Sequence, residues 1–412
     1  MTTTAAPGSA PTSSASTSSA AAPTRPGRFT EADCQVQDFA ALVDQVTELS
    51  DYPHAADVQL NVLVYDAAAL RASITSEQDR IEVEAELVRA LTEGPGVVAF
   101  KGAFPDTAVV DRATVSFDEI IAAEQAAGGG HNDHFAKAGA NSRVWNALEK
   151  LAVRDPGTFV DYYGNDILAL ISTAWLGPGY QVTSQVNVVR PGGQAQDPHR
   201  DYHLGFLSNE VAAGYPAHVH LLSPVLTLQG AVAHSDMPVE SGPTMYLPYS
   251  HQYAPGYLAW RLPEFRAFFA ERHVQLPLEK GDAAFFNPAL FHGAGTNVST
   301  DVQRMANLLQ VSSAFGRAME TVDRTKVSKA VYPVLRARRS AGADPASLAN
   351  ALASAAEGYP FPSNLDLDEN VGGLTPLAQS ALLQQALAED WDAERASTAL
   401  DAYATRHRTD EI

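Results

Sequence analysis

Two residues that can ligate a metal, His199 and Asp201, lie two positions apart in the segment "AQDPHRDYHLGF" (195–206). Alternate residues of an extended chain project to the same side, so both side chains are expected to point in one direction. Two histidines and one carboxylate on one face bind Fe(II) and leave coordination positions open for other ligands. The pair therefore requires a second histidine from a distant part of the chain.

The segment "GDAAFFNPALFHGAGTNVSTDVQRMANLLQ" (281–310) supplies such a histidine and a cation behind it. His292 closes an apolar strand, a Gly-rich turn follows, and Arg304 opens the next strand. The planar fork of an arginine matches a carboxylate with two parallel hydrogen bonds. The spacing predicts His199, Asp201 and His292 as metal ligands, with Arg304 holding the carboxylate of a cosubstrate.

Other histidines lack one of these features, and a structural or solvent-exposed role is the simpler interpretation for each of them. The alternatives are a loop pair (His131 and His134, near Asp133), a pair without a carboxylate at matching spacing (His218 and His220), a turn-like pair (His234 and Asp236), and His251, the main rival for the third ligand, which lacks a following basic strand.

The strand-like segment "QVTSQVNVV" (181–189) carries polar residues at alternate positions. Thr183, Gln185 and Asn187 are therefore expected on one face of the strand. That face either lies beside the metal or is solvated. Gln185 and Asn187 are candidate cofactor-binding residues on the first interpretation.

The elements that must position these residues change in type along the chain. Residues 180–315 consist of short strands separated by Pro and Gly, with a helix near 256–272, which is typical of a sandwich or barrel. The flanking regions show helical spacing. We expect a mainly β protein with flanking helices, divided into a disordered tail (1–28), a β-rich domain whose N-terminal part is helical (29–316), and a helical C-terminal extension packed on the same domain (317–412).

Composition restricts the class of partner and the compartment. A net charge of −20 argues against nucleic acid, because phosphate binding needs a basic surface. The single cysteine, Cys34, excludes an internal disulfide and favours a reducing, cytoplasmic location. No apolar run approaches the length of a membrane span. One basic segment, 316–340 with seven Lys or Arg, is either a solvated helical face or a docking patch for an acidic substrate.

Four stretches, in this order, resemble the phytanoyl-CoA dioxygenase-like family of Fe(II)/2-oxoglutarate oxygenases. The resemblance assigns the iron ligands and the 2-oxoglutarate arginine to the residues named above. Two positions depart from the family pattern: Ala294 replaces a Ser or Thr, for which Thr296 is the expected substitute in cofactor binding, and Tyr249 replaces a Gly. The stretches are "GPGVVAFKGAF" (94–104), "RPGGQAQDPHRD" (190–201), "ESGPTMYLPYSHQ" (240–252) and "KGDAAFFNPALFHGAG" (280–295).

The resemblance implies a double-stranded β-helix (a jelly-roll, cupin-like core) that uses Fe(II), 2-oxoglutarate and O2. It implies hydroxylation of an aliphatic C–H bond of a small-molecule substrate, with release of succinate and CO2. Asp201 favours hydroxylation, because related halogenases replace this carboxylate by a small residue. Desaturation, cyclisation and epimerisation stay open, as does a catalytically silent binding protein on the same frame. Neither the substrate nor the oligomeric state is indicated.

Overall fold

The computed structural model describes residues 1–2, 27–127, 141–368, 370 and 373–409. Most of the expected tail, and the His131–His134 loop, lie outside these residues. The last two residues of the expected tail make backbone contacts: Gly27 accepts a hydrogen bond from Ala217, and Arg28 forms an isolated bridge with Pro216. The division of the chain into three parts stays a prediction.

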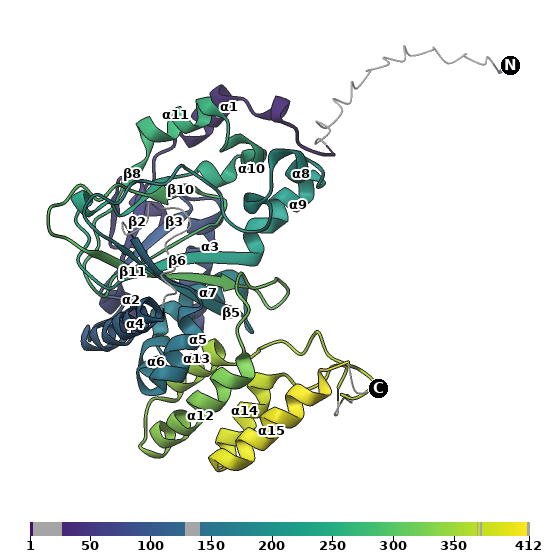
Figure 1. The fold of residues 1–412 in the computed structure, drawn as a ribbon. Coiled ribbons are helices and arrows are strands. Elements are labelled where there is room, and N and C mark those ends of the chain that lie inside the picture. Colours follow the sequence, from purple (N-terminus) through teal and green to yellow (C-terminus); the bar gives the residue numbers. More distant parts are fainter. Residues whose placement is uncertain (3–26, 128–140, 369, 371–372, 410–412) are drawn as a thin grey trace.

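A large twisted sheet runs through the centre of the molecule (Figure 1). Its strand order is β1-β2-β3-β9-β6-β11-β5-β4, and only the β2–β3 pair among these described strands is parallel. β11 lies between β6 and β5; residues 306–312 pair with both neighbours, which fixes their register, and Arg304 and Met305 pair with β5 alone. The strands are β1 (Asp57–Gln59), β2 (Val62–Asp66), β3 (Val97–Lys101), β4 (Asn141–Val144), β5 (Gln181–Val189), β6 (Thr227–Ala233), β9 (Ala283–Phe286) and β11 (Arg304–Ser312).

A smaller sheet carries the segment of the second histidine. Its order is β10-β7-β8, and both strand pairs are antiparallel. Tyr246 of β7 packs edge-on against Phe286 of the large sheet, with ring centroids 5.2 Å apart, so the two sheets meet through an apolar cluster. The strands are β7 (Thr244–Leu247), β8 (Val274–Gln275) and β10 (Phe291–Ala294).

Helices cover the face of the large sheet that is turned away from the small one. Their apolar residues share one continuous core with strand residues such as Val186, Leu228 and Phe285. Several helices begin at side-chain caps; Ser76, for example, accepts a hydrogen bond from the backbone of Asp79. These helices are α2 (Ala67–Ser73), α3 (Glu77–Thr92), α4 (Ala108–Ala126), α5 (Ala147–Arg154), α6 (Pro156–Tyr163) and α7 (Asp166–Leu176).

A second group of helices lies around the small sheet, at the opposite end of the molecule (Figure 1). Phe39, Phe265 and Phe291 meet there in an aromatic cluster with centroid separations near 5 Å (5.0 Å for Phe39 to Phe291). The segment "AHVHLL" forms a helix with Pro216 at its start, although its histidines alternate as they would in a strand. The helices are α1 (Val36–Val43), α8 (Asn209–Ala213), α9 (Ala217–Leu222), α10 (Gly256–Ala259) and α11 (Pro263–Arg272).

The chain ends in helices that pack onto α5, α6 and α7 through the same core as the large sheet. The basic face of α12 is paired within the molecule: Lys326 with Glu149, Arg338 with Asp161, and Arg336 with Asp390. These pairs favour the solvated-face interpretation of segment 316–340 over a docking patch. The helices are α12 (Arg324–Ser340), α13 (Pro345–Ala355), α14 (Gln379–Ala388) and α15 (Ala393–Arg406).

The expected mainly β composition is not confirmed, because the structure is a mixed α/β protein with one large sheet. The helical spacing on both sides of the β region accounts for the difference, since those helices supply most of the main core. Within the described residues, no helix has the length and apolarity needed to cross a membrane.

His234, predicted to be part of a turn, lies in the core at the end of β6. Its Nδ1 is 2.8 Å from the Thr114 hydroxyl, and its Nε2 is 2.9 Å from the Tyr162 hydroxyl. Burial lowers the pKa of His234 to about 3. In the unfolded chain the imidazole has a pKa of about 6.5. Between that pH and about 3, the unfolded chain takes up a proton on His234 while the folded protein keeps the imidazole neutral.

Acid is therefore expected to destabilise the protein through His234. The unfolded state binds the extra proton as pH falls below about 6.5, so this contribution is lost progressively from there towards about 3. His234→Gln should flatten the decline in unfolding free energy between pH 7.5 and 5.5, as measured by urea unfolding, even if the variant is less stable at pH 7.5. An unchanged slope would contradict this assignment.

Candidate metal centre

The segment that carries His199 and Asp201 is extended but is not a regular strand. His199 forms a single β-bridge with His292, in which each backbone N–H donates to the other residue's carbonyl at 2.9 and 3.2 Å. Pro198 cannot donate a ladder hydrogen bond, and Tyr202 turns the chain with a positive φ of 63°. One of the short strands expected between residues 180 and 315 therefore does not form over 198–206, although the two side chains do share one side.

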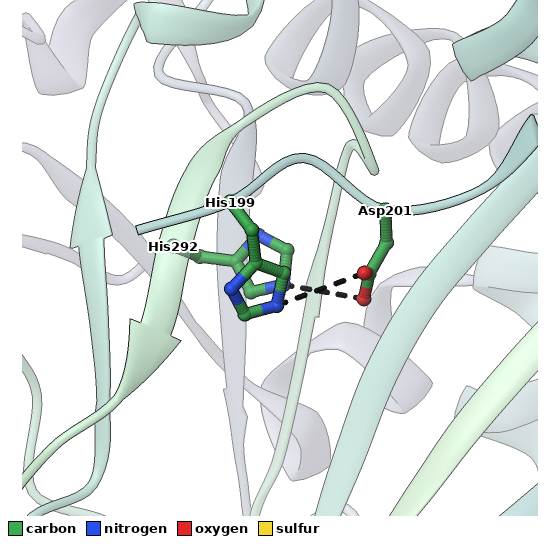
Figure 2. Close-up of side chains that lie close together, drawn as sticks. All are labelled: His199, Asp201 and His292. Carbon is green, nitrogen blue, oxygen red and sulfur yellow. Dashed lines mark ion pairs between the residues drawn. The ribbon is translucent and has the colours of Figure 1, made fainter. Parts of the chain in front are cut away.

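The structure brings His199, Asp201 and His292 together (Figure 2). One ligand atom from each residue lies within 4.8 Å of the others. The Nε2 of His199 is 3.6 Å from one Asp201 carboxylate oxygen, and the Nε2 of His292 is 3.5 Å from the other. The two imidazole centroids are 4.4 Å apart. This cluster could hold a metal ion.

The outer nitrogens of both imidazoles are already engaged. Nδ1 of His199 lies 3.0 Å from the carbonyl of Asp197, and Nδ1 of His292 lies 2.9 Å from that of Leu290. A carbonyl can only accept, so each Nδ1 carries the proton and each Nε2 presents a lone pair towards Asp201. Metal-binding histidines are oriented by this kind of contact. The donor set and its tautomers fit Fe(II).

Asp201 is held in the ionised form that a metal requires. Burial alone would raise its pKa, but the charge and hydrogen bonding that the neighbouring imidazoles supply in their protonated forms, together with the Gln229 amide, outweigh burial and lower the pKa. The Gln229 Nε2 donates to one carboxylate oxygen. Burial lowers the pKa of His199, which keeps its Nε2 unprotonated at neutral pH. Gln229 therefore orients the carboxylate from the floor of the large sheet.

Arg200, the residue between the two ligands, points to the opposite side and is 2% exposed. Its guanidinium donates to the carbonyls of Ser250 (2.6 Å) and Tyr253 (3.0 Å) and lies 5.2 Å from the ring centroids of both Tyr257 and Phe291. Burial lowers its pKa to about 10, so it is still charged at neutral pH. Arg200 anchors a segment that has few backbone hydrogen bonds of its own.

Replacing Arg200 by Met should lower both stability and metal affinity. Each carbonyl left without a donor is expected to cost about 1–3 kcal/mol of unfolding free energy, and Lys should restore only part because it lacks the fork. Urea unfolding and anaerobic iron titration measure the two effects, with Arg272→Met, an exposed position on α11, as control. Iron affinity equal to wild type in folded Arg200→Met would contradict the anchoring role.

A cavity of about 850 Å³ opens beside the cluster and is walled by both sheets. Alternate residues of β11 face it, from Arg304 through Ala306 and Leu308 to Gln310. Its volume falls in the usual range for small-molecule sites. The cluster and Arg304 thus open into one space.

Arg304 is 6% exposed and begins β11, as the sequence predicts. Its Nη1 donates to the carbonyl of Gly242. Burial lowers its pKa to about 10, which leaves the guanidinium charged. No ion pair of Arg304 exists within the described residues. A buried arginine in this state can bind a carboxylate that enters the cavity.

The other predicted cofactor residues fall into two groups. Gln185 and Asn187 line the cavity, and Gln185 accepts a hydrogen bond from Arg143 at 2.9 Å. Thr296 is not among the described residues that line it; its hydroxyl accepts from the backbone of Ala195 at 3.0 Å. Thr296 therefore closes the turn beside the site, and its role in cofactor binding stays a prediction.

The rival histidines that the structure describes are not part of the cluster. His251 lies 3.1 Å from the carbonyl of Thr92 and against Gly96, outside the described cavity wall. His220 lies 3.1 Å from the carbonyl of Ala212 in the second helical group. His131, Asp133 and His134 fall outside the described residues.

Sequence reasoning missed Gln229, Arg143 and the pair Trp260–Arg261, all of which line the cavity. Gln229 was detectable in principle, because it is the one residue with a polar side chain in the otherwise apolar run "LQGAVA" (228–233). The others come from elements whose position depends on tertiary packing.

The model of one protein family, described as phytanoyl-CoA dioxygenase, matches residues 92–306, which is just over half of the chain. The chain belongs to the phytanoyl-CoA dioxygenase family. Enzymes of this family use Fe(II) and 2-oxoglutarate. Membership places the chain among the non-haem iron, 2-oxoglutarate-dependent enzymes, in agreement with the resemblance found in its sequence. A comparison with curated proteins finds no match.

Solved structures of 2-oxoglutarate-dependent enzymes are among those similar to this member of the family. The carbocyclase SnoK from nogalamycin biosynthesis is 22% identical, with a TM-score of 0.41 over 56% of this chain and 83% of its own. The epimerase SnoN, in complex with Fe3+, alpha ketoglutarate and nogalamycin RO, is 19% identical, with a TM-score of 0.39 over 60% and 85%. AviO1 from Streptomyces viridochromogenes Tue57 is 17% identical, with a TM-score of 0.39 over 59% and 98%.

Proposed function

We propose that this protein is an Fe(II)/2-oxoglutarate-dependent dioxygenase that hydroxylates an aliphatic C–H bond of a small molecule. The observation that carries the proposal is one cavity that contains the His199, Asp201 and His292 cluster and the buried cation Arg304. A facial set of two histidines and a carboxylate suits non-haem Fe(II) and leaves positions for cosubstrate and O2. We further propose that the two sheets form the double-stranded β-helix expected from the sequence.

Each residue has a defined task in this proposal. His199, Asp201 and His292 hold the metal, and Arg304 binds the far carboxylate of 2-oxoglutarate. Bound Fe(II) and 2-oxoglutarate supply the oxidation of a C–H bond by O2, with release of succinate and CO2. Gln229 keeps the Asp201 carboxylate oriented, and the cavity walls hold the substrate and exclude water.

Asp201 also bears on the outcome of the reaction. Its carboxylate occupies the position that a small residue takes in related halogenases, so no space for a halide is expected beside the metal. Hydroxylation follows when the substrate presents one C–H bond to the site and the oxygen atom is transferred to that carbon. The proposal keeps a small-molecule substrate and a cytoplasmic location.

Anaerobic addition of Fe(II) and 2-oxoglutarate tests the proposal directly. A competent site gives a weak visible charge-transfer band when 2-oxoglutarate chelates the bound metal. Admission of O2 in the presence of a substrate should then release succinate, and screening of small-molecule libraries by succinate release identifies that substrate. Iron binding without the band would contradict the assignment of 2-oxoglutarate to this cavity.

A further inference from the structure

The cavity wall carries a charge opposite to that of the whole protein. The chain has a net charge of −20, yet the charged residues that line the cavity are five arginines against two aspartates within the described part of the chain. On the proposed function, Fe(II) and Arg304 balance Asp201 and the two carboxylates of 2-oxoglutarate. Four arginines then remain among the described lining residues, where Asp197 is the other acid; one of the four, Arg143, also interacts with Glu320.

Two of these four arginines are placed to meet a substrate. The guanidinium of Arg200 is enclosed by carbonyls and aromatic rings, and Arg143 donates to Gln185. Arg261 and Arg266 instead lie beside the ligand segment: Arg261 donates to the carbonyl of Gly205 at 2.9 Å, four residues after Asp201, and Arg266 pairs with Asp197, two residues before His199. They bracket the segment that carries two of the proposed metal ligands.

Arg261 is presented as a flat, half-buried cation. Its Cζ lies 3.7 Å from the centroid of the Trp260 ring, and Trp260 also lines the cavity. Among the described residues, its guanidinium donates hydrogen bonds to two neutral oxygens, the carbonyl of Gly205 and the side-chain amide oxygen of Asn209 (3.4 Å). It forms no ion pair with any described residue. Burial, and then the charge of Arg266, lower the pKa of Arg261. A guanidinium next to a second cation gains from an anion that enters the cavity.

Among the described residues, the acid that forms an ion pair with one of these two arginines is Asp197, and it is a weak partner. The Asp197 side chain is 70% exposed and that of Arg266 is 41% exposed, so water screens their ion pair. Arg261, Arg266 and Asp197 together carry one net positive charge, which matches a carboxylate better than a doubly charged phosphate. The planar fork of Arg261 also fits a carboxylate. Phe206 and Met319 add exposed apolar surface to the same cavity wall, at 55% and 37%.

We infer that the substrate is an organic monocarboxylate with an apolar body, and that Arg261, supported on Trp260 and beside Arg266, binds its carboxylate. The inference rests on the proposed function, because it assigns Arg304 to 2-oxoglutarate and leaves Arg261 for the substrate. It adds the chemical class of the substrate and a specificity-determining residue for the same cavity.

A matched pair of probes tests this inference: 4-phenylbutanoate and its primary amide, which has the same shape without the charge. Binding is measured by anaerobic titration calorimetry at millimolar probe, on protein loaded with Fe(II) and saturating 2-oxoglutarate. Wild type should prefer the carboxylate by tenfold to about a hundredfold, the range for one charged hydrogen-bonded contact. Arg261→Gln should abolish the preference, Arg261→Lys should keep part of it, and Arg272→Gln, on the exposed side of α11, should leave it unchanged.

The outcomes separate a binding role from a structural one. If Arg261 only holds Gly205, Arg261→Gln will weaken both probes equally and lower the melting temperature, and the inference is overturned. An equal response of wild type to acid and amide, including no binding of either, overturns it as well. Failure of the proposed function is recognised separately, because the charge-transfer band is then absent before any probe is added.

Discussion

Replacing His292 by alanine should abolish iron binding, while replacing its sequence rival His251 should not. His292 contributes one of three proposed ligands, and its Nε2 faces the Asp201 carboxylate at 3.5 Å. Loss of even an outer partner of a metal ligand costs about 10- to 100-fold in affinity, so loss of a ligand should exceed that. His199→Ala and Asp201→Ala should behave in the same way. Anaerobic iron titration of the purified variants measures the effect.

Two controls make this result specific. His218 is an exposed histidine on α9, and His218→Ala should match wild type in both stability and iron stoichiometry. His251 is half-buried, packs against Gly96 and lies 3.1 Å from the carbonyl of Thr92, so His251→Ala is expected to lose stability while it still binds one iron per chain. The assignment fails if His251→Ala loses iron and His292→Ala keeps it.

The metal ligands could be predicted from the sequence because their geometry is local. The two-residue spacing of His199 and Asp201 places both side chains on one side in any extended conformation, and this relation holds although no regular strand forms over 198–206. His292 and Arg304 followed from a strand, a turn and a second strand within one short segment. The order of the family motifs then linked the two segments across the fold.

Other parts of the site depend on contacts that no local pattern contains. The anchoring role of Arg200 could not be predicted, because the carbonyls of Ser250 and Tyr253 that hold it come from a 3-10 turn that is distant in the sequence. Arg261 lies between two short helices that the sequence indicated as one helix, near 256–272. Its position beside the ligand segment results from the packing of α10 and α11 on the small sheet.

Short segments with mixed periodicity explain the errors in secondary structure. The six residues "AHVHLL" alternate in polarity like a strand, yet they form α9. Such a run is too short for its period to decide between helix and strand. Pro216 before it is the better indicator, since proline is favoured near the start of a helix. The mixed α/β composition has a different origin: the helices on both sides of the β region supply apolar residues to the main core.

Arg304→Ala should raise the concentration of 2-oxoglutarate needed for half-maximal succinate release by two to three or more orders of magnitude. The guanidinium is 6% exposed and charged, and a carboxylate bound to it would be desolvated and matched by two parallel hydrogen bonds. Removing one partner of a buried pair of this kind costs about 3–5 kcal/mol, which corresponds to that loss of affinity. Burial lowers the pKa of Arg304 only to about 10, so the pair should be intact throughout the neutral range.

The variants at this position should separate cosubstrate binding from metal binding. Arg304 is not one of the three residues in the metal cluster, so Arg304→Ala should bind iron nearly as well as wild type while its charge-transfer band requires much more 2-oxoglutarate. Arg304→Lys should recover only part of the affinity, because a point charge lacks the fork. The measurement is succinate formation against 2-oxoglutarate concentration for the three proteins. An unchanged half-saturating concentration of 2-oxoglutarate in Arg304→Ala would contradict the assignment. The role would then pass to another cation of the cavity wall, with Arg143 and Arg261 as the candidates. The charge balance that leaves Arg261 for the substrate would no longer hold.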